Sequence, residues 1–474
     1  MSVRAWSAGA VAGSASVGLA IAAVAVATPA NAERATQLYI PALAIVAAVS
    51  FAVIVWLVDP AYTLSATIFL TPLAGNWPQL GVPGPLSPDR LLGAGAILAV
   101  LLRAPPIADR PRLRLTLAHG VLALAMAYAL ASAFAAGTLT QNAPFLKLVD
   151  AFGIMPFLIF LAAPLAFRTS HQRRVLLGTL VALGAYLGFN TLFQMSGLHA
   201  LVWPKYILDP GYGIHVGRGR GPFVDAVANG IALYTCAIAC AIAAASWRTR
   251  SMRALAIAVG LLCMVGCLLT LERSVWIGVV LGTSVAMLVR HELRRHFLSV
   301  VAAVAVAVGT ALVVIPGLSE KVSGRAGDQG TIWDRQNLAR TSVNMIETKP
   351  LFGFGWSTFI SESRDYYEQA LEYPLTATDE GVHNVPLTYA VELGLVGMTL
   401  WVVGVLIGIG GALATRGPPD LEQWRLALLA LVIASLVVIN SVPPSTWLNR
   451  SIWLLAAVVY SGRYIVGQQA ANPG

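Results

Sequence analysis

Long uninterrupted apolar segments recur from one end of this 474-residue chain to the other. A helix of about 20 apolar residues crosses the hydrocarbon layer of a bilayer, where the backbone must satisfy its hydrogen bonds internally. Hydrophobic residues make up 57% of the sequence and charged residues only 11%, and the apolar positions come in blocks instead of amphipathic stripes. These features predict an all-α, polytopic membrane helical bundle and exclude a soluble globular protein.

The apolar blocks define the expected membrane spans, about 12 to 14 in number. They lie at 6–28, 39–58, 61–75, 90–102, 115–136, 144–167, 175–196, 225–246, 254–271, 275–289, 297–315, 386–414, 426–442 and 451–467. Spans this dense leave no room for a separate soluble domain, so we expect residues 1–474 to form one transmembrane bundle. Two long connections interrupt the bundle, at 197–224 and at 316–385.

The net charge of +9 comes largely from arginines that cluster in alternate short connections. Such clusters mark the cytoplasmic side of a membrane protein. We therefore expect both termini and the turns at 103–114, 168–174, 247–253 and 290–296 to be cytoplasmic, and the two long loops to lie outside the cytoplasmic membrane. The first apolar run, which ends near Ala30 and Ala32, fits either a cleaved signal sequence or a retained span. No basic tail indicates nucleic acid as a partner.

The four cysteines form two pairs with i, i+4 spacing, Cys236 with Cys240 and Cys263 with Cys267. This spacing puts each pair on one face of a helix. A metal or redox site is one interpretation. Packing of small residues between helices is the other, and it is favoured because no histidine shares these helices.

Lys147 and Asp150 are charged residues near the start of the span at 144–167. Charged side chains inside a bilayer need a partner or a water-filled cavity. Because they lie three positions apart, they can pair with each other on one helix face. The alternative is that they line a cavity.

Two arginine motifs lie in the expected extracytoplasmic connections. Arg218 and Arg220 stand among glycines in VGRGRGPFVDAVANGIALY, and Arg273 lies in LTLERSVWIG, where it breaks the cytoplasmic arginine pattern. Guanidinium groups fork onto phosphate oxygens, and glycines let a ligand approach the backbone closely. The alternatives are a solvated loop for the first motif and a structural pair of Glu272 with Arg273 for the second.

The loop at 316–385 is long for an otherwise economical chain, which indicates a function. Its sequence TIWDRQNLARTSVNMIETKPLFGFGWSTF predicts an amphipathic helix at 332–348, which Pro350 ends, and a second helix near 357–370. We expect these helices to cap the bundle at the membrane interface. His383 and Asn384 follow, directly before the span at 386–414.

In order and spacing, GRGRGPF, RSVW, DRQNLARTSVNMIETKPLFGFGWSTF and HNVPLTYAVELGLVG resemble the O-antigen ligase and polymerase superfamily. The resemblance covers about residues 216–400, although Ser342 stands where the family's helix commonly carries tryptophan. It implies a GT-C-like, metal-independent glycosyltransferase with no cofactor, acting outside the cytoplasmic (inner) membrane. Its donor would be an undecaprenyl-diphosphate-linked glycan, and its acceptor a glycan or lipid-linked hydroxyl such as a lipid A core.

By motif match, the essential family residues fall on Arg220, Arg273 and His383. Arginines stabilise a leaving diphosphate without a metal, and a histidine can remove the acceptor proton near neutral pH. We expect Arg218, Arg335 and Asn384 to bind substrate beside them. Glu392, Gly394 and Gly397 would serve helix packing. No Asp-x-Asp pair that might hold a divalent cation occurs in the two long loops.

The sequence leaves three activities open. A ligase passes a finished glycan to a terminal acceptor, whereas a polymerase of a surface polysaccharide joins lipid-linked repeat units. A polysaccharide or lipid transporter also has many spans, but it more often shows internal repeats and interrupted helices, and we find no repeat. A non-catalytic scaffold would tolerate the loss of His383.

Overall fold

The structure is a computed structural model that describes residues 49, 51–82, 87–103, 115–327, 330–368, 381–441 and 445–463. Every regular element within these ranges is a helix, which confirms the predicted all-α class. The predicted span at 6–28, most of the span at 39–58 and the proposed cleavage site lie outside the described residues.

The helices follow the apolar segments closely. In chain order they are α3 (Pro60–Leu70), α4 (Pro88–Leu102), α5 (Leu117–Ala135), α6 (Asn142–Leu146), the π-helix η5 (Lys147–Phe152), α7 (Ile154–Ala166), α8 (Ser170–Met195), α9 (Ala226–Ser246), α10 (Arg250–Leu269), α11 (Arg273–Val289), α12 (His291–Arg294), α13 (Phe297–Val314), α14 (Leu318–Gly327), α15 (Gly330–Thr348), α16 (Phe359–Glu362), α17 (Val385–Leu413), α18 (Pro419–Val438) and α19 (Thr446–Tyr460).

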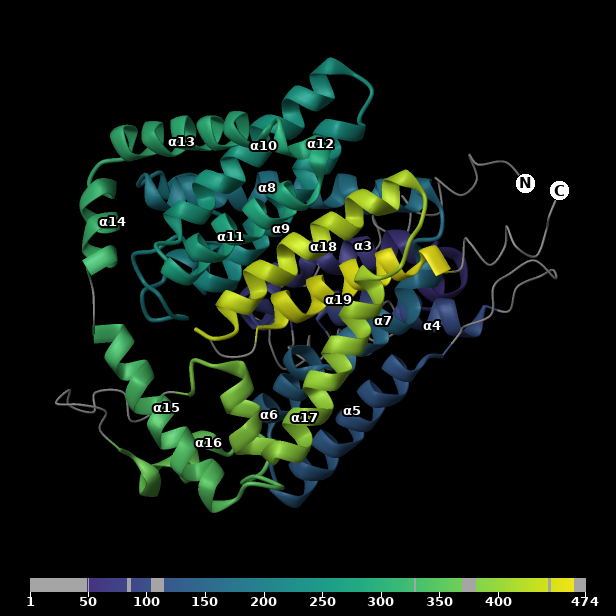
Figure 1. Cartoon of the computed structure of the whole chain (residues 1–474), viewed down its shortest axis with the longest axis vertical. Coiled ribbons are helices and arrows are strands. Elements are labelled where there is room, and N and C mark those ends of the chain that lie inside the picture. Colours follow the sequence, from purple (N-terminus) through teal and green to yellow (C-terminus); the bar gives the residue numbers. More distant parts are fainter. Residues whose placement is uncertain are drawn as a thin grey trace, which may run out of the picture.

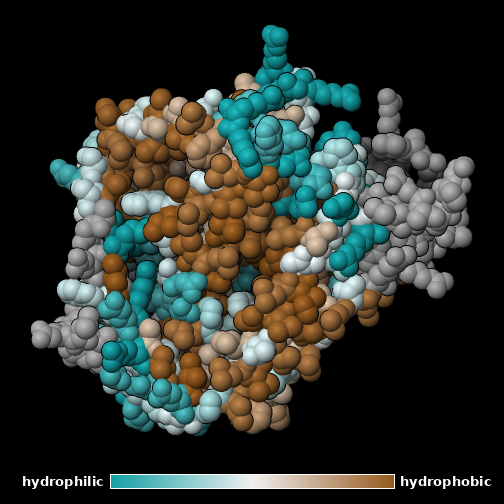
Figure 2. Space-filling view, viewed as in Figure 1, coloured by the Kyte–Doolittle hydropathy of each residue, from teal (hydrophilic) through white to brown (hydrophobic). Residues whose placement is uncertain are grey.

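Within the part of the chain that the structure describes, eight helical segments are long and apolar enough to cross a membrane: α5, the unit from α6 to α7, α8, α9, α10, α13, α17 and α18. The shorter apolar helix α11 lies among them and packs along α18. The chain is thus a multi-pass membrane protein. In Figure 2 hydrophobic side chains cover the surface over α11, α13 and α18, and hydrophilic side chains gather around α14 and α15 on one side and α12 on the other.

Small residues let α8, α9 and α10 approach closely. A Cβ atom on Gly184 would lie 2.8 Å from Cys236 Cβ and 2.9 Å from Cys263 Sγ, so a larger residue has no room there. All four cysteines are buried and free. These contacts confirm the packing interpretation of the cysteine pairs.

The arginine-rich turns meet at one end of the bundle. Arg173, at the start of α8, lies 2.7 Å from Asp420, at the start of α18. Arg290, at the end of α11, lies 3.6 Å from Glu422. The opposite end carries segment 197–224, the turn between α10 and α11, and the helices α14 and α15 (Figure 1), and we name it the loop end.

The segment after α13 folds down one side of the bundle. Figure 1 shows α14 along the left edge and α15 below it, beside α16 and α17. The predicted helix at 332–348 is confirmed as α15. The second predicted helix, near 357–370, is shorter than expected: α16 covers four residues and a 3₁₀ turn follows at Ser363–Tyr366, while 369–380 lie outside the described residues.

Helix α17 is broken at Gly394, where φ is 67° and ψ is 179°. The loop at 350–355 fills the break: the N–H groups of Phe354 and Gly355 donate to the carbonyls of Val391 and Glu392, each at 2.9 Å. A Cβ atom on Gly394 would lie 2.2 Å from the Leu351 carbonyl oxygen. Gly394 therefore serves a backbone crossing, which only glycine permits.

The sequence indicated that Glu392 serves helix packing. In the structure its carboxylate also forms an ion pair. It accepts a hydrogen bond from Lys147 at 3.1 Å. The predicted pair of Lys147 with Asp150 is wrong, because both residues lie in the π-helix η5. A π-helix has a wider turn than an α-helix, so residues three apart no longer share one face.

Asp150 instead joins a buried network of four charged residues. Arg450 on α19 donates to Asp89 at 2.7 Å and also to Asp150, and Arg90 donates to Asp150 at 3.0 Å. The indole N–H of Trp77 donates to Asp89 at 2.8 Å. The two arginines and two aspartates balance in charge, and Arg450 and Asp89 are both completely buried.

Candidate active site

The glycine-rich segment 211–224 forms a tightly fastened loop at the loop end. The Gly219 N–H donates to the Leu269 carbonyl at 2.9 Å, and Gln194 and Asn229 donate to the carbonyls of Arg218 and Gly219, each at 2.8 Å. A Cβ atom on Gly219 would lie 2.8 Å from the Leu269 oxygen. This loop is therefore held against α8, α9 and α10 by its backbone.

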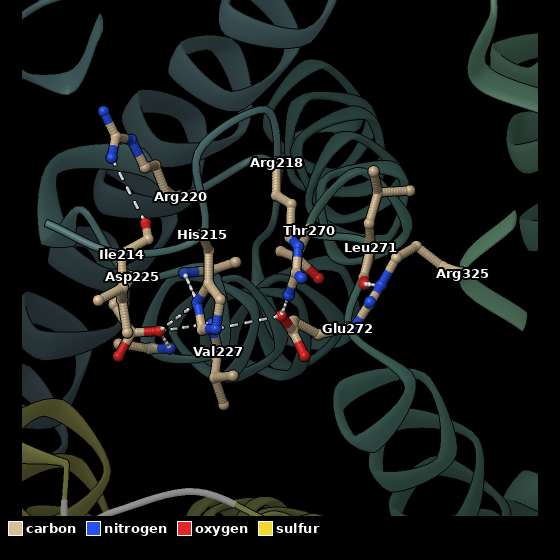
Figure 3. A network of polar contacts seen from close by, with 12 residues as sticks. Ile214, His215, Arg218, Arg220, Asp225, Val227, Thr270, Leu271, Glu272 and Arg325 are labelled. Carbon is tan, nitrogen blue, oxygen red and sulfur yellow. Dashed lines mark hydrogen bonds and ion pairs between the residues drawn. The ribbon is translucent and has the colours of Figure 1, made fainter. Parts of the chain in front are cut away.

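Arg220 is the buried anchor of this loop, with 1% of its surface exposed. Its guanidinium donates to the carbonyls of Ile207 at 2.8 Å and Tyr212 at 2.7 Å, and also to that of Asp209. Burial lowers the pKa of this guanidinium, and Asp209 opposes that shift. The side chain points away from the other labelled charges in Figure 3.

This geometry differs from the predicted role of Arg220 as a catalytic contact to diphosphate. Its donors already serve backbone carbonyls within the loop, so a ligand would have to displace them. The structure gives Arg220 a task in shaping the loop, and Arg218, two residues earlier, carries the accessible guanidinium.

Arg218 reaches across to the start of α11. Its guanidinium donates to the carboxylate of Glu272, the residue that precedes α11, and only 3% of Glu272 is exposed. The sequence also allowed a pair of Glu272 with the adjacent Arg273. In the structure the ion pair of Glu272 is with Arg218. Residues i and i+1 at a helix start point in different directions, which leaves Glu272 available to Arg218.

His215 lies between two carboxylates in the same cluster (Figure 3). Its Nδ1 is 3.4 Å from Asp225 Oδ1, and its Nε2 is 3.6 Å from Glu272 Oε1. Asp225 is also the N-cap of α9, where its carboxylate accepts from the Val227 N–H at 2.8 Å. Two helix starts, those of α9 and α11, thus bring their acidic residues to one imidazole.

Three further arginines surround Glu272. Burial lowers the pKa of the Arg335 guanidinium on α15; Glu272 opposes that shift, while the positive charges of Arg273, Arg325 and Arg218 add to it. Arg325, on α14, donates to the Leu271 carbonyl at 3.4 Å. Arg218, Arg273 and Arg325 therefore lie near enough to Arg335 to act on it electrostatically, as does the buried carboxylate of Glu272.

This cluster has the electrostatic character of an anion site. Arg218, Arg273, Arg325 and Arg335 carry four positive charges, and among the described residues the carboxylate of Glu272 pairs with Arg218 while that of Asp225 faces His215. Guanidinium groups gathered in this way suit the oxygens of a phosphate.

His383 and Asn384 lie at the start of α17. The Asn384 side chain caps α17 by accepting from the Leu387 N–H at 3.0 Å and donates to Asn440 at 3.2 Å. Val382 packs in one hydrophobic cluster with Leu338 of α15. His383 follows Val382 in the chain, and Arg335 lies three residues before Leu338 on α15. Asn384 thus has a structural task beside its predicted role with substrate.

Sequence reasoning missed His215 and the true partner of Glu272. The pairing of Arg218 with Glu272 joins residues 54 positions apart, and no local pattern encodes it. His215 carried one usable signal, because it is a titratable residue set among glycines three positions before Arg218. Within the described residues, no three histidine, cysteine, aspartate or glutamate side chains are grouped to hold a metal ion.

Comparison with known proteins relates part of this sequence to one protein family. Residues 257–402 match a family model described as O-antigen ligase. The match begins within α10, includes Arg273, α13 to α16 and His383, and ends within α17; the loop that carries Arg218 and His215 lies before it. No curated protein matches the sequence.

Proposed function

We propose, from the premise that this chain belongs to the O-antigen ligase and polymerase superfamily, that it is a glycosyltransferase of the ligase type. It transfers a glycan from an undecaprenyl-diphosphate-linked donor to an acceptor hydroxyl, such as that of a lipid A core. The reaction takes place at the outer, periplasmic face of the cytoplasmic membrane.

The cluster of four arginines around Glu272 is the observation that carries this proposal. Breaking the bond between a sugar and a lipid diphosphate develops negative charge on the leaving phosphate. Preorganised guanidinium groups stabilise that charge, and they do so strongly where water is excluded. Arg218, Arg273 and Arg335 are the proposed donor contacts, and they supply the charge that a metal ion supplies in other transferases.

His383 is the proposed general base for the acceptor hydroxyl. It stands at the start of an apolar helix, beside the contact between α15 and α17, where a lipid-borne substrate and an acceptor in water can meet. Imidazole accepts a proton near neutral pH, which suits removal of a hydroxyl proton in the transition state.

The sidedness follows from the two ends of the bundle. The turns that contain Arg173 and Arg290 gather at the end opposite the loop end, and arginine-rich turns favour the cytoplasm. The loop end, with the arginine cluster, then faces outward. Single-cysteine labelling of intact cells tests this: residues 197–224 should react and 168–174 should not, and the reverse pattern would overturn the proposed sidedness.

Analysis of lipid-linked glycans in a deletion strain tests the activity. A ligase defect leaves long glycan chains on undecaprenyl diphosphate outside the membrane, whereas a polymerase defect leaves single repeat units there. A transporter defect would leave the glycan on the cytoplasmic side. Complementation with Arg273→Ala should fail, and complementation with Arg174→Ala, the same change at an exposed site on the opposite end, should succeed.

A further inference from the structure

At the proposed donor site, each of the two imidazole nitrogens of His215 faces a different carboxylate. Nε2 faces Glu272 at 3.6 Å and Nδ1 faces Asp225 at 3.4 Å. The Ala226 N–H donates to Nδ1 at 3.3 Å. A nitrogen that accepts a hydrogen bond carries no proton, so this contact describes the neutral ring with its proton on Nε2.

Arg218 and His215 share Glu272. In the arrangement of Figure 3, Arg218 donates to the Glu272 oxygen that His215 Nε2 also faces. If Arg218 turned to a diphosphate, the nearly buried Glu272 carboxylate would lose its closest charged partner. Burial makes the loss of a close counter-ion costly for a carboxylate, and His215, whose Nε2 already faces the same oxygen, is placed to offset that loss.

We propose that His215 is a positioning residue of the donor site, which takes up a proton and pairs with Glu272 when Arg218 moves to the donor diphosphate. The inference rests on the proposed function and adds a proton to donor binding. One proton enters from water and binds Nδ1, where it faces Asp225 and ends the hydrogen bond from the Ala226 N–H. The Nε2–H of the resulting imidazolium pairs with Glu272 in place of Arg218, and Arg218 meets the diphosphate. Donor release reverses each change.

Charges of both signs lie around His215. The carboxylates of Asp225 and Glu272 face the ring and favour the imidazolium, whereas the guanidinium of Arg218, which shares Glu272, opposes it. Arg273, Arg325 and Arg335 lie beyond Arg218 in the same cluster. A diphosphate that draws Arg218 away from Glu272 removes the opposition of Arg218. Histidine is the side chain whose charge changes near neutral pH, so it can be neutral in one state and charged in the other. A quarter of the His215 side chain (24%) is exposed, which gives the proton a route from water.

The backbone also holds His215 in place. Its φ of 59° lies in the left-handed region, which residues other than glycine rarely adopt. The N–H of Ile214 donates to the Val224 carbonyl at 3.0 Å, and the Arg218 N–H donates to the His215 carbonyl at 3.2 Å. A conformation of this kind persists where surrounding contacts enforce it, as they commonly do at functional sites.

Donor binding at several pH values tests the proposal. The probe is undecaprenyl diphosphate, titrated into the full-length protein in detergent between about pH 6 and pH 8.5, a range that spans histidine titration. Because the bound state holds one more proton, affinity should be greatest at the acid end and fall by up to about tenfold per pH unit as pH rises. Calorimetry in two buffers with different ionisation enthalpies should report the proton uptake directly.

Three variants separate the explanations. His215→Gln keeps an N–H donor but cannot titrate, so its affinity should vary less with pH and proton uptake should disappear. Glu272→Gln removes the carboxylate that needs a partner, so it should also flatten the profile. His199→Gln, at an exposed site in the same connection outside the cluster, should keep the parental profile.

The outcomes are distinguishable. A His215→Gln protein that binds the probe with the parental pH dependence and proton uptake would overturn the role of His215 and leave the proposed function intact. A folded parental protein that binds no undecaprenyl diphosphate at any pH would overturn both. A merely structural role for His215 predicts a monodisperse variant with uniformly weaker binding and an unchanged slope, which would also exclude the proposal.

Discussion

Removal of one charge from the buried network of Arg450, Asp89, Asp150 and Arg90 should destabilise the protein far more than a change at a surface ion pair. Asp89→Asn keeps an oxygen for the Trp77 indole N–H, which lies 2.8 Å away, and changes little volume. It leaves the four-residue network with one uncompensated positive charge. Arg450 is completely buried, so water cannot replace the lost partner.

The expected loss in the free energy of unfolding is about 3–5 kcal/mol, the usual result when one partner of a buried pair is removed. The double variant Asp89→Asn with Arg450→Met restores neutrality, because Arg90 still pairs with Asp150. We therefore expect the double variant to be at least as stable as Asp89→Asn alone. Glu368→Gln, at an exposed pair with Arg340, should leave the free energy of unfolding nearly unchanged.

Equilibrium unfolding in mixed micelles, followed by tryptophan fluorescence, measures these differences. A double-mutant cycle then gives the coupling between Asp89 and Arg450, which should be about 2 kcal/mol or more for a contact of this kind. Additive losses from Asp89→Asn and Arg450→Met would show that the network has no such coupling. Equal losses at Asp89 and Glu368 would refute the argument from burial.

Substitutions at four residues of the proposed active site should have different effects. His383→Ala should lower turnover about 10²-fold or more and leave donor binding nearly intact, measured by single-turnover transfer and by titration; transfer at the parental rate would exclude it as the base. Arg273→Ala should weaken donor binding and slow transfer together, and Arg273→Lys should restore only part of both because an ammonium cannot fork across two oxygens; full rescue would exclude a bidentate contact. Arg220→Ala should expose segment 205–220 to limited proteolysis, whereas Arg218→Ala should leave that segment protected and weaken donor binding; the opposite result would return the diphosphate contact to Arg220.

Much of the fold could be predicted because a membrane helix is encoded locally. Twenty apolar residues in a row specify a helix wherever they lie in the chain, and α15 is recognisable by its period and by Pro350. The π-helix η5 and the break at Gly394 were not predicted. Both depend on contacts with distant segments, such as the loop at 350–355 that supplies carbonyl and N–H partners to the broken α17.

The residues of the site could be located by motif, but their partners could not. Glu272 has an arginine next to it in sequence, yet Arg218 is the arginine that reaches it. Arg218 and Arg220 belong to one short motif, but their side chains have different partners. Arg220 binds carbonyls within its own loop, whereas Arg218 reaches Glu272 at the start of α11. Likewise, no spacing rule joins Asp89 and Asp150 to Arg450, because these residues meet through the packing of three separate helical segments.

Single-turnover transfer by the purified protein tests the central claim most directly. The protein, in detergent with EDTA, receives a lipid-linked glycan labelled in both the sugar and the lipid, together with acceptor. Glycan should appear on the acceptor while an equal amount of free undecaprenyl diphosphate forms, and both products should be lost in Arg273→Ala. A monodisperse, donor-binding protein that leaves all glycan on its lipid would contradict the proposed transferase, and activity that requires added magnesium or manganese would contradict the role assigned to the arginine cluster.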